Sequence, residues 1–292
     1  MVRLGDDGSD HFIDRTGHNG FGGGGGNMLG CLLPLIASRF GIGGIVVLLI
    51  GYVILTSIGG GGILPSGSGP SQQAPSGQSR LTAEDRRILS GVLLSTEQVW
   101  SELFRRAGKT YRPAEMVAYS NVGQSGCGVA QAAMGPFYCP TDQRIYIDPA
   151  FFNELDRRFG APGDFAQAYV IAHEVGHHIQ NLEGTLDRAS AAQARASRAE
   201  GNQIQVGIEL QADCYAGVWA ANARDAQGSI LEPGDLEEGM RAAEAIGDDT
   251  LQRQSQGRVV PESFTHGTAE QRMAALRRGL ESGDPAACNF VG

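Results

Sequence analysis

Two histidines and a glutamate stand close together in the segment His173-Glu174-Val175-Gly176-His177. Residues four apart are neighbours on one face of an α-helix, so both imidazoles could reach a single cation. Neutral imidazole suits Zn²⁺, and a catalytic zinc keeps one coordination position for water. Glu174 follows the first histidine directly and could take a proton from that water. The motif therefore predicts a hydrolytic zinc site; the alternative is a pair of histidines on a helix flank that bind no metal.

The motif needs a helix, and the surrounding pattern predicts one of about 19 residues that starts at Asp164 and stops at Gly184. Asp164 and Gln167 have the spacing of a capping box. Apolar residues follow the i, i+3, i+4, i+7 rhythm of a stripe that faces a core, namely Ala168, Ile171, Ala172, Val175, Ile179 and Leu182. His178 is one step off the ligand face, so we expect it to be exposed to solvent or to lie behind the ligands.

Two histidines and a water leave a zinc ion one protein ligand short. Glu209 and Asp213 are four apart in a second, mostly apolar helix expected over about 204–223. Ionised carboxylates in apolar surroundings need partners. We predict that Glu209 is the third ligand and that Asp213 accepts an N–H from a ligating histidine. Glu200 and Glu183 are rival ligands, and a solvated Glu209 is the further alternative.

His266 is the remaining histidine of the part that we expect to fold. It precedes Thr268-Ala-Glu-Gln271, which has the pattern of a capping box, so His266 should stand at the entrance of a helix. There it could hydrogen-bond the oxyanion that forms when water attacks a peptide carbonyl, which makes it a catalytic candidate beside Glu174. A histidine in a surface loop is the alternative.

The composition limits the class of protein. The chain has 292 residues and a net charge of -9, and its acidity argues against a nucleic-acid partner. No cysteine sits in a C-x-x-C pair, so a structural zinc cluster is not favoured. Two disulfides are expected if the domain lies outside the cytosol. Cys127–Cys139 would flank a short loop, and Cys214–Cys288 follows by elimination; buried free thiols are the alternative.

The part from residue 81 onward has the composition of one globular domain, with about 210 residues to bury a core. We expect a helix to about Ala107, strands at Met116–Tyr119 and Arg144–Asp148, and helices beyond Pro149. This order predicts an α+β fold, rich in helix with a small sheet. The strand Arg144–Asp148 could offer its edge to an extended peptide.

An uncharged apolar run of 18 residues, Gly41–Ile58, precedes this domain. As a helix it would span about 27 Å, and with the residues up to Leu64 it would cross a hydrocarbon layer of about 30 Å. We therefore predict one transmembrane helix over 41–64 that attaches the protein to a membrane. A cleaved signal peptide and a buried core helix are the alternatives.

The flanks of this run are polar and rich in glycine, serine or proline. We expect residues 1–40 to be a disordered tail and juxtamembrane segment, with His11 and His18 solvated, and residues 65–80 to be a flexible linker. The nearest charge, Arg39, precedes the run and favours an N-terminus on the inside. Together with the cysteines, this predicts a single-pass inner-membrane protein whose domain, residues 81–292, lies on the exocytoplasmic (periplasmic) side.

Several segments of the domain, taken together, resemble the bacterial family of "putative neutral zinc metallopeptidases". They are Ser125-Gly-Cys-Gly128, Gly135-Pro-Phe-Tyr-Cys-Pro140, Ile145-Tyr-Ile-Asp148, Ala172-His-Glu-Val-Gly-His-His178, Glu209-Leu-Gln-Ala-Asp-Cys214 and His266-Gly-Thr268. The arrangement is also similar to that of the membrane-bound prenyl-protein and heat-shock-type zinc proteases. This likeness implies a zincin-like domain with Zn²⁺ on His173, His177 and Glu209, and places His266 near the substrate. The chain departs from those proteases at Gly267, where they carry proline.

The leading hypothesis is a membrane-anchored zinc endopeptidase that acts on protein or peptide substrates, with Glu174 as general base. A second hypothesis is a membrane-tethered binding or regulatory module whose metal is structural. A third is a zinc hydrolase that cleaves bonds other than peptide bonds.

Overall fold

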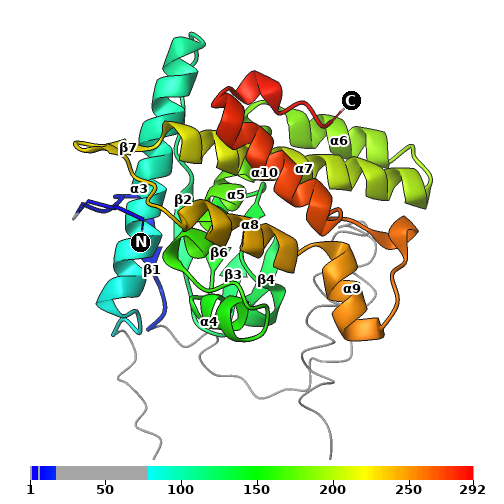
Figure 1. The fold of residues 1–292 in the computed structure, drawn as a ribbon, viewed down its shortest axis with the longest axis horizontal. Helices are drawn as coiled ribbons and strands as arrows, with labels where there is room; N and C mark the ends of the chain where they lie inside the picture. The colour runs from blue at the N-terminus through cyan, green and yellow to red at the C-terminus, as the bar shows by residue number, and fades with distance from the viewer. Residues whose placement is uncertain (1, 6, 18–77, 292) are drawn as a thin grey trace, which may run out of the picture.

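The computed structural model describes residues 2–5, 7–17 and 78–291 (Figure 1). Its helices are α3 (Ala83–Arg106), α4 (Ala150–Arg157), α5 (Asp164–Leu182), α6 (Thr185–Gln193), α7 (Arg198–Asn222), α8 (Asp235–Ala245), α9 (Asp248–Gln256) and α10 (Ala269–Ser282). Its strands are β1 (Phe12–Asp14), β2 (Glu115–Ala118), β3 (Val122–Ser125), β4 (Gly128–Gln131), β5 (Phe137–Cys139), β6 (Arg144–Ile147), β7 (Arg224–Asp225) and β8 (Gly228–Ser229). The expected α+β class, rich in helix with a small sheet, is confirmed.

The main sheet has the strand order β1-β2-β6-β5. The strands β1, β2 and β6 run parallel, and β5 pairs antiparallel with β6. Both edges of β6 are therefore occupied, and the expectation that Arg144–Asp148 offers an edge to a peptide is wrong. Among the described strands, β5 forms the end of the sheet next to α5, so the free edge lies one strand further out than expected.

Helix α5 is the central helix, with contacts to the sheet and to α3, α7 and α8 (Figure 1). Its N-cap is Gly163, which makes no side-chain cap, so the expected capping box is wrong. Asp164 instead accepts a hydrogen bond from the backbone N–H of Val2, because the N-terminal segment packs against this end of the helix. The predicted stop is confirmed: Gly184, two residues beyond the last helical residue, has a left-handed backbone with φ of 69°.

Helix α7 begins six residues earlier than expected, because Ser197 and Glu200 form a capping box at its start. It packs closely against α5. A Cβ atom added to Gly176 would stand 2.9 Å from the backbone oxygen of Ala212, so a larger residue would push the helices apart. The glycine between the two motif histidines thus lets α7 bring its own side chains to them.

The N-terminal segment is part of the domain. Phe12–Asp14 forms β1 on β2, and Val2 is 1% exposed in the main core. His11 lies 3.0 Å from the carboxylate of Glu97 on α3. The expectation of a disordered tail is therefore wrong for residues 2–5 and 7–17. Most residues of this segment are polar or charged, so the prediction gave little weight to the few apolar side chains, among them Val2 and Phe12, that pack into the core.

Two disulfides are present, Cys127–Cys139 and Cys214–Cys288, with Cα–Cα distances of 5.8 and 5.6 Å. This confirms the expected pairing. The first joins the β3–β4 hairpin to β5, and the second ties the C-terminal segment to α7.

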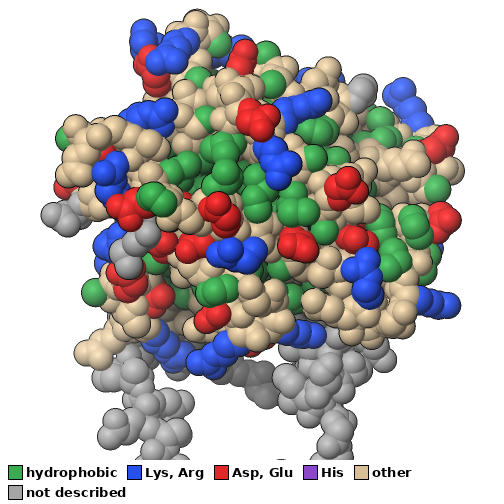
Figure 2. Space-filling model, viewed as in Figure 1, with side chains coloured by type: hydrophobic (Ala, Val, Ile, Leu, Met, Phe, Trp, Pro, Cys, Tyr) green, Lys and Arg blue, Asp and Glu red, His purple; other side chains and the backbone are tan. Residues whose placement is uncertain are grey.

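On the face drawn in Figure 2, acidic and basic side chains are interspersed, with hydrophobic side chains between them. None of the helices in the described ranges is both long and apolar enough to cross a membrane. The predicted span over 41–64 lies outside the residues that the structure describes.

Candidate active site

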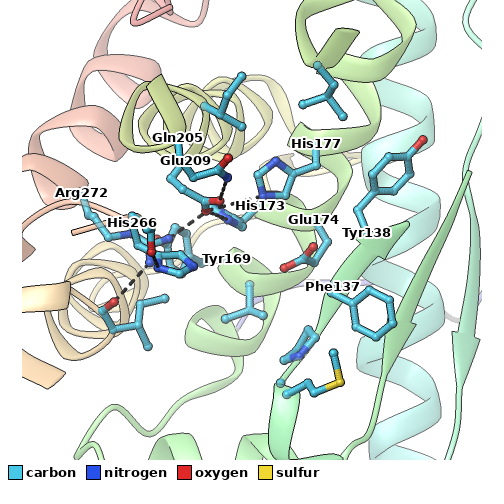
Figure 3. A pocket seen from close by; sticks show the side chains of 18 of the residues that line it. Phe137, Tyr138, Tyr169, His173, Glu174, His177, Gln205, Glu209, His266 and Arg272 are labelled. Atoms are coloured by element: carbon cyan, nitrogen blue, oxygen red, sulfur yellow. Dashed lines mark hydrogen bonds and ion pairs between the residues drawn. The ribbon is translucent and has the colours of Figure 1, made fainter. Parts of the chain in front are cut away.

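Three side chains from two helices converge at one point (Figure 3). The Nε2 atoms of His173 and His177, both on α5, lie 3.3 and 3.6 Å from Oε2 of Glu209 on α7. One ligand atom from each of the three residues lies within 4.8 Å of the other two. The structure thus brings together all three predicted ligands.

The hydrogen bonds of the two imidazoles are those expected of histidines that bind a metal ion. Nδ1 of His173 lies 2.8 Å from Oδ1 of Asp213, and Nδ1 of His177 lies 2.8 Å from Oε1 of Gln180. Both partners are acceptors, so each histidine places its proton on Nδ1 and keeps the lone pair of Nε2 for the common point. Two such nitrogens and one carboxylate oxygen are a donor set that suits Zn²⁺ and leaves a position open for water.

Asp213 holds His173 from a fully buried position. It accepts hydrogen bonds from the hydroxyl of Tyr169 at 2.6 Å and from Nε and Nη2 of Arg272, each at 2.9 Å. Burial alone would raise the pKa of Asp213, but the guanidinium of Arg272 and the imidazole of His173 lower it to about 2. The carboxylate is therefore ionised at neutral pH, and the structure places it where the sequence predicted.

Replacing Asp213 by Ala should destabilise the protein strongly, since Arg272 would remain buried without its carboxylate. Loss of one partner of a buried ion pair typically costs about 3–5 kcal/mol. Denaturant unfolding of the full chain measures this loss. The double variant Asp213→Leu, Arg272→Met removes both charges and should recover part of it. A free energy of unfolding within about 1 kcal/mol of wild type for the single variant would contradict the expectation.

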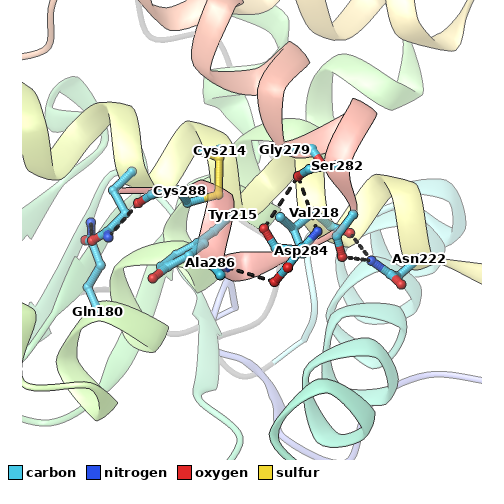
Figure 4. The surroundings of a disulfide bond; sticks show 12 residues. Gln180, Cys214, Tyr215, Val218, Asn222, Gly279, Ser282, Asp284, Ala286 and Cys288 are labelled. Atoms are coloured by element: carbon cyan, nitrogen blue, oxygen red, sulfur yellow. Dashed lines mark hydrogen bonds between the residues drawn. A yellow bond between two sulfur atoms is a disulfide. The ribbon is translucent and has the colours of Figure 1, made fainter. Parts of the chain in front are cut away.

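A chain of amides holds His177 from behind. Figure 4 shows two members of this chain, Gln180 and Cys288, and the disulfide from Cys288 to Cys214. The Nε2 of Gln180 donates to the backbone oxygen of Ile208 at 2.7 Å and to Oε1 of Gln211 at 3.0 Å. The side chain of Gln211 donates in turn to the backbone oxygen of Cys288 at 2.8 Å. Because Cys288 is bonded to Cys214, the disulfide fixes the far end of this chain, which orients Gln180 with its oxygen toward the histidine.

Replacing Gln180 by Leu should therefore weaken zinc binding by about 10–100-fold, the usual effect of removing the acceptor behind a ligating histidine. A competition titration with a chromophoric chelator measures the affinity. The same change at the exposed Gln254 on α9 is the matched control and should leave the affinity at the wild-type value. Equal affinities for the two variants would show that Gln180 does not position His177.

Glu209 is held by its second oxygen. Oε1 accepts a hydrogen bond from the side chain of Gln205 at 2.9 Å, which leaves Oε2 facing the histidines. Burial alone would raise the pKa of Glu209, but His266 and His177 lower it well below its usual value. The rival ligands lie elsewhere, since Glu200 caps α7 and Glu183 accepts a hydrogen bond from the hydroxyl of Tyr215.

Glu174 points into a cavity of about 430 Å³ beside the imidazoles (Figure 3). The residue is only 6% exposed, so its side chain is shielded from bulk solvent. One wall of the cavity comes from the segments around β5 and α4, a second from α6 and α7, and a third from the C-terminal part. Apolar side chains from these walls include Phe137, Tyr138, Phe151, Phe159, Leu186 and Ile208.

His266 lines the same cavity, with its side chain 25% exposed, so it is not an open surface-loop residue. Asp248 fixes its loop: Oδ2 accepts the backbone N–H groups of Thr265 at 2.6 Å and His266 at 2.7 Å. Burial alone would lower the pKa of His266, but the carboxylates of Glu209 and Asp248 raise it. The predicted start of the following helix is confirmed by the capping box of Thr268 and Gln271.

His178 is 0% exposed, so the first of its two expected positions, exposure to solvent, is wrong. Its Nε2 lies 2.6 Å from the backbone oxygen of Arg112, and its Nδ1 lies 3.1 Å from the hydroxyl of Tyr138 on β5. Burial lowers the pKa of His178, which keeps the ring neutral. Asn181 also donates to the hydroxyl of Tyr138, so α5 holds β5 in place beside the cavity.

Sequence reasoning missed the residues that support the ligands, namely Tyr169, Gln180, Gln205, Asp248 and Arg272. Two of them carried a signal. Tyr169 precedes His173 by four residues and so shares its helical face. Arg272 lies on the apolar stripe of α10 with Ala269 and Leu276, where a charged residue needs a buried partner.

Comparison with known proteins agrees with this geometry. The model of the family described as "Putative neutral zinc metallopeptidase" matches residues 1–291. The chain belongs to this family. The match includes the N-terminal segment that carries β1.

Two curated proteins are similar to this chain over most of their length. "Uncharacterized protein YpfJ" of Escherichia coli (strain K12) is 48% identical over 250 residues, which cover 85% of each chain. "Uncharacterized protein Rv2575" of Mycobacterium tuberculosis (strain ATCC 25618 / H37Rv) is 40% identical over 225 residues, 73% of this chain and 74% of the relative. No solved structure matches the chain significantly.

Proposed function

We propose that this protein is a membrane-attached, zinc-dependent endopeptidase with a zincin-like domain. The observation that carries the proposal is the convergence of His173, His177 and Glu209 on the wall of a cavity into which Glu174 points. Membership of the zinc metallopeptidase family supports the metal and the general class of reaction.

The three converging residues would hold the zinc ion. When bound there, zinc supplies a Lewis acid that polarises a peptide carbonyl and lowers the pKa of a water. Glu174 takes a proton from the attacking water and delivers it to the amide nitrogen that leaves. His266, on the opposite side of the group from Glu174, donates a hydrogen bond to the carbonyl oxygen as negative charge develops on it.

The substrate is an extended peptide. The end strand β5, beside the cavity, leaves its outer backbone groups open to pairing with such a chain. Aromatic and aliphatic side chains of the cavity walls favour an apolar substrate side chain next to the scissile bond. The chain is acidic, with a net charge of -9, which argues against a nucleic-acid partner.

The apolar run over 41–64 attaches the protein to a membrane. Two disulfides support an exocytoplasmic location for the domain, because such bonds persist in oxidising compartments.

The test is cleavage of casein, an unstructured protein, by the detergent-solubilised full chain. We expect cleavage that stops when a chelator removes the metal and returns when zinc is restored in excess of the chelator. A zinc-loaded protein without cleavage would favour the binding module with a structural metal. Turnover of small esters or amides but not of casein would favour the non-peptide hydrolase.

A further inference from the structure

The N-terminal segment and the catalytic domain form one folded unit, although the predicted membrane span lies between them in the sequence. β1 pairs in parallel register with β2, with Phe12 opposite Met116 and Asp14 opposite Ala118. The backbone N–H of Arg3 donates to the backbone oxygen of Ile230 at 2.9 Å. Residues 2–5 and 7–17 therefore contribute a strand and core side chains to the domain, and Figure 1 shows β1 beside β2 and α3.

The two described ends that flank residues 18–77 lie side by side. The hydroxyl of Thr16 accepts the backbone N–H of Arg80 at 2.8 Å. The carboxylate of Asp14 accepts hydrogen bonds from Ser79 and Arg86, each at 2.5 Å. Burial alone would raise the pKa of Asp14, but these partners lower it, so the contact holds a charged carboxylate.

This arrangement conflicts with a single crossing of the membrane. One helix across a hydrocarbon layer of about 30 Å puts the residues before and after it on opposite sides. Backbone hydrogen bonds between β1 and β2 require their strands to lie about 4.8 Å apart. A bilayer cannot stand between them.

We propose that residues 2–17 and residues 78–291 lie on the same side of the membrane, and that any membrane entry of the chain between them begins and ends on that side. This replaces the expected arrangement with the N-terminus inside and the domain outside. The two disulfides assign the shared side to the exocytoplasmic face. The inference rests on the strand pairing and not on peptidase activity.

Labelling with a membrane-impermeant maleimide tests the proposal in spheroplasts that express the full chain. Cys31 is first replaced by Ser, since the other four cysteines are paired. One reporter is Asp10→Cys in the N-terminal segment, and the other is Lys109→Cys after α3; both positions are exposed. We expect both to be labelled before lysis.

Labelling of both reporters only after lysis would still support a shared side, but would move it to the cytoplasm. The proposal is overturned if Lys109→Cys is labelled before lysis and Asp10→Cys only afterwards. Neither result depends on catalysis. The proposed peptidase function can therefore fail while this inference stands, and this inference can fail while the peptidase function stands.

A cross-link gives an independent measurement. The double variant Asp14→Cys, Ser79→Cys places two thiols where the native side chains touch. A specific protease site inserted in the linker before residue 78 allows the chain to be cut after isolation. On a denaturing gel, we expect the fragments to stay joined without reductant and to separate with it; the single variant Asp14→Cys should release its fragment in both conditions. Fragments of the double variant that separate without reductant, even after oxidant treatment of intact cells, would contradict the proposed contact.

Discussion

The variant Glu174→Gln should cleave casein about 10²–10⁴-fold more slowly than the wild-type protein while keeping its zinc, because the amide cannot take a proton from the attacking water. Glu174 follows the first ligand on α5 and points into the cavity, but it is not one of the three converging groups. Initial cleavage rates and the zinc content of the same samples measure the two properties.

Glu270→Gln is the matched control, as Glu270 is exposed in the first turn of α10. This variant should retain both the wild-type rate and the zinc. Undiminished cleavage by Glu174→Gln would remove the proposed general base. Loss of zinc from that variant would instead mean that Glu174 contributes to the metal site.

The variant Glu209→Ala should lose both zinc and activity. It removes the only carboxylate that meets the two imidazoles among the described residues, and two histidines alone form an incomplete zinc site. We expect the zinc content of the purified full chain to fall from about one ion per chain to a small fraction of that. Elemental analysis after dialysis against a weak chelator measures it.

Glu200→Ala serves as the comparison for this second variant, because Glu200 is the rival ligand from the same helix. Its loss removes a helix cap and should lower the stability by about 1 kcal/mol, but the zinc should remain. Zinc retained by Glu209→Ala and lost by Glu200→Ala would reverse the assignment of the third ligand.

Helical periodicity is enough to predict the part of the site that lies along a single helix. Four-residue spacing places His173 and His177 on one face of a helix, and the same spacing relates Glu209 to Asp213. The apolar stripe located α5 to within two residues at its C-terminal end. These features are local, since the rise and turn of a helix fix them whatever the rest of the chain does.

How the helices and strands pack against one another could not be predicted in this way. Gly176 lets α7 approach α5 closely enough for Glu209 to reach the histidines, and Arg272 reaches Asp213 from a helix 59 residues further along the chain. Strand order placed β6 inside the sheet and left β5 at its end. The segment around Phe12 forms a strand only because the edge of β2 accepts it. A local sequence pattern shows which face of a segment is apolar. Which element packs against that face depends on the whole chain, so it cannot be predicted from a short window of sequence.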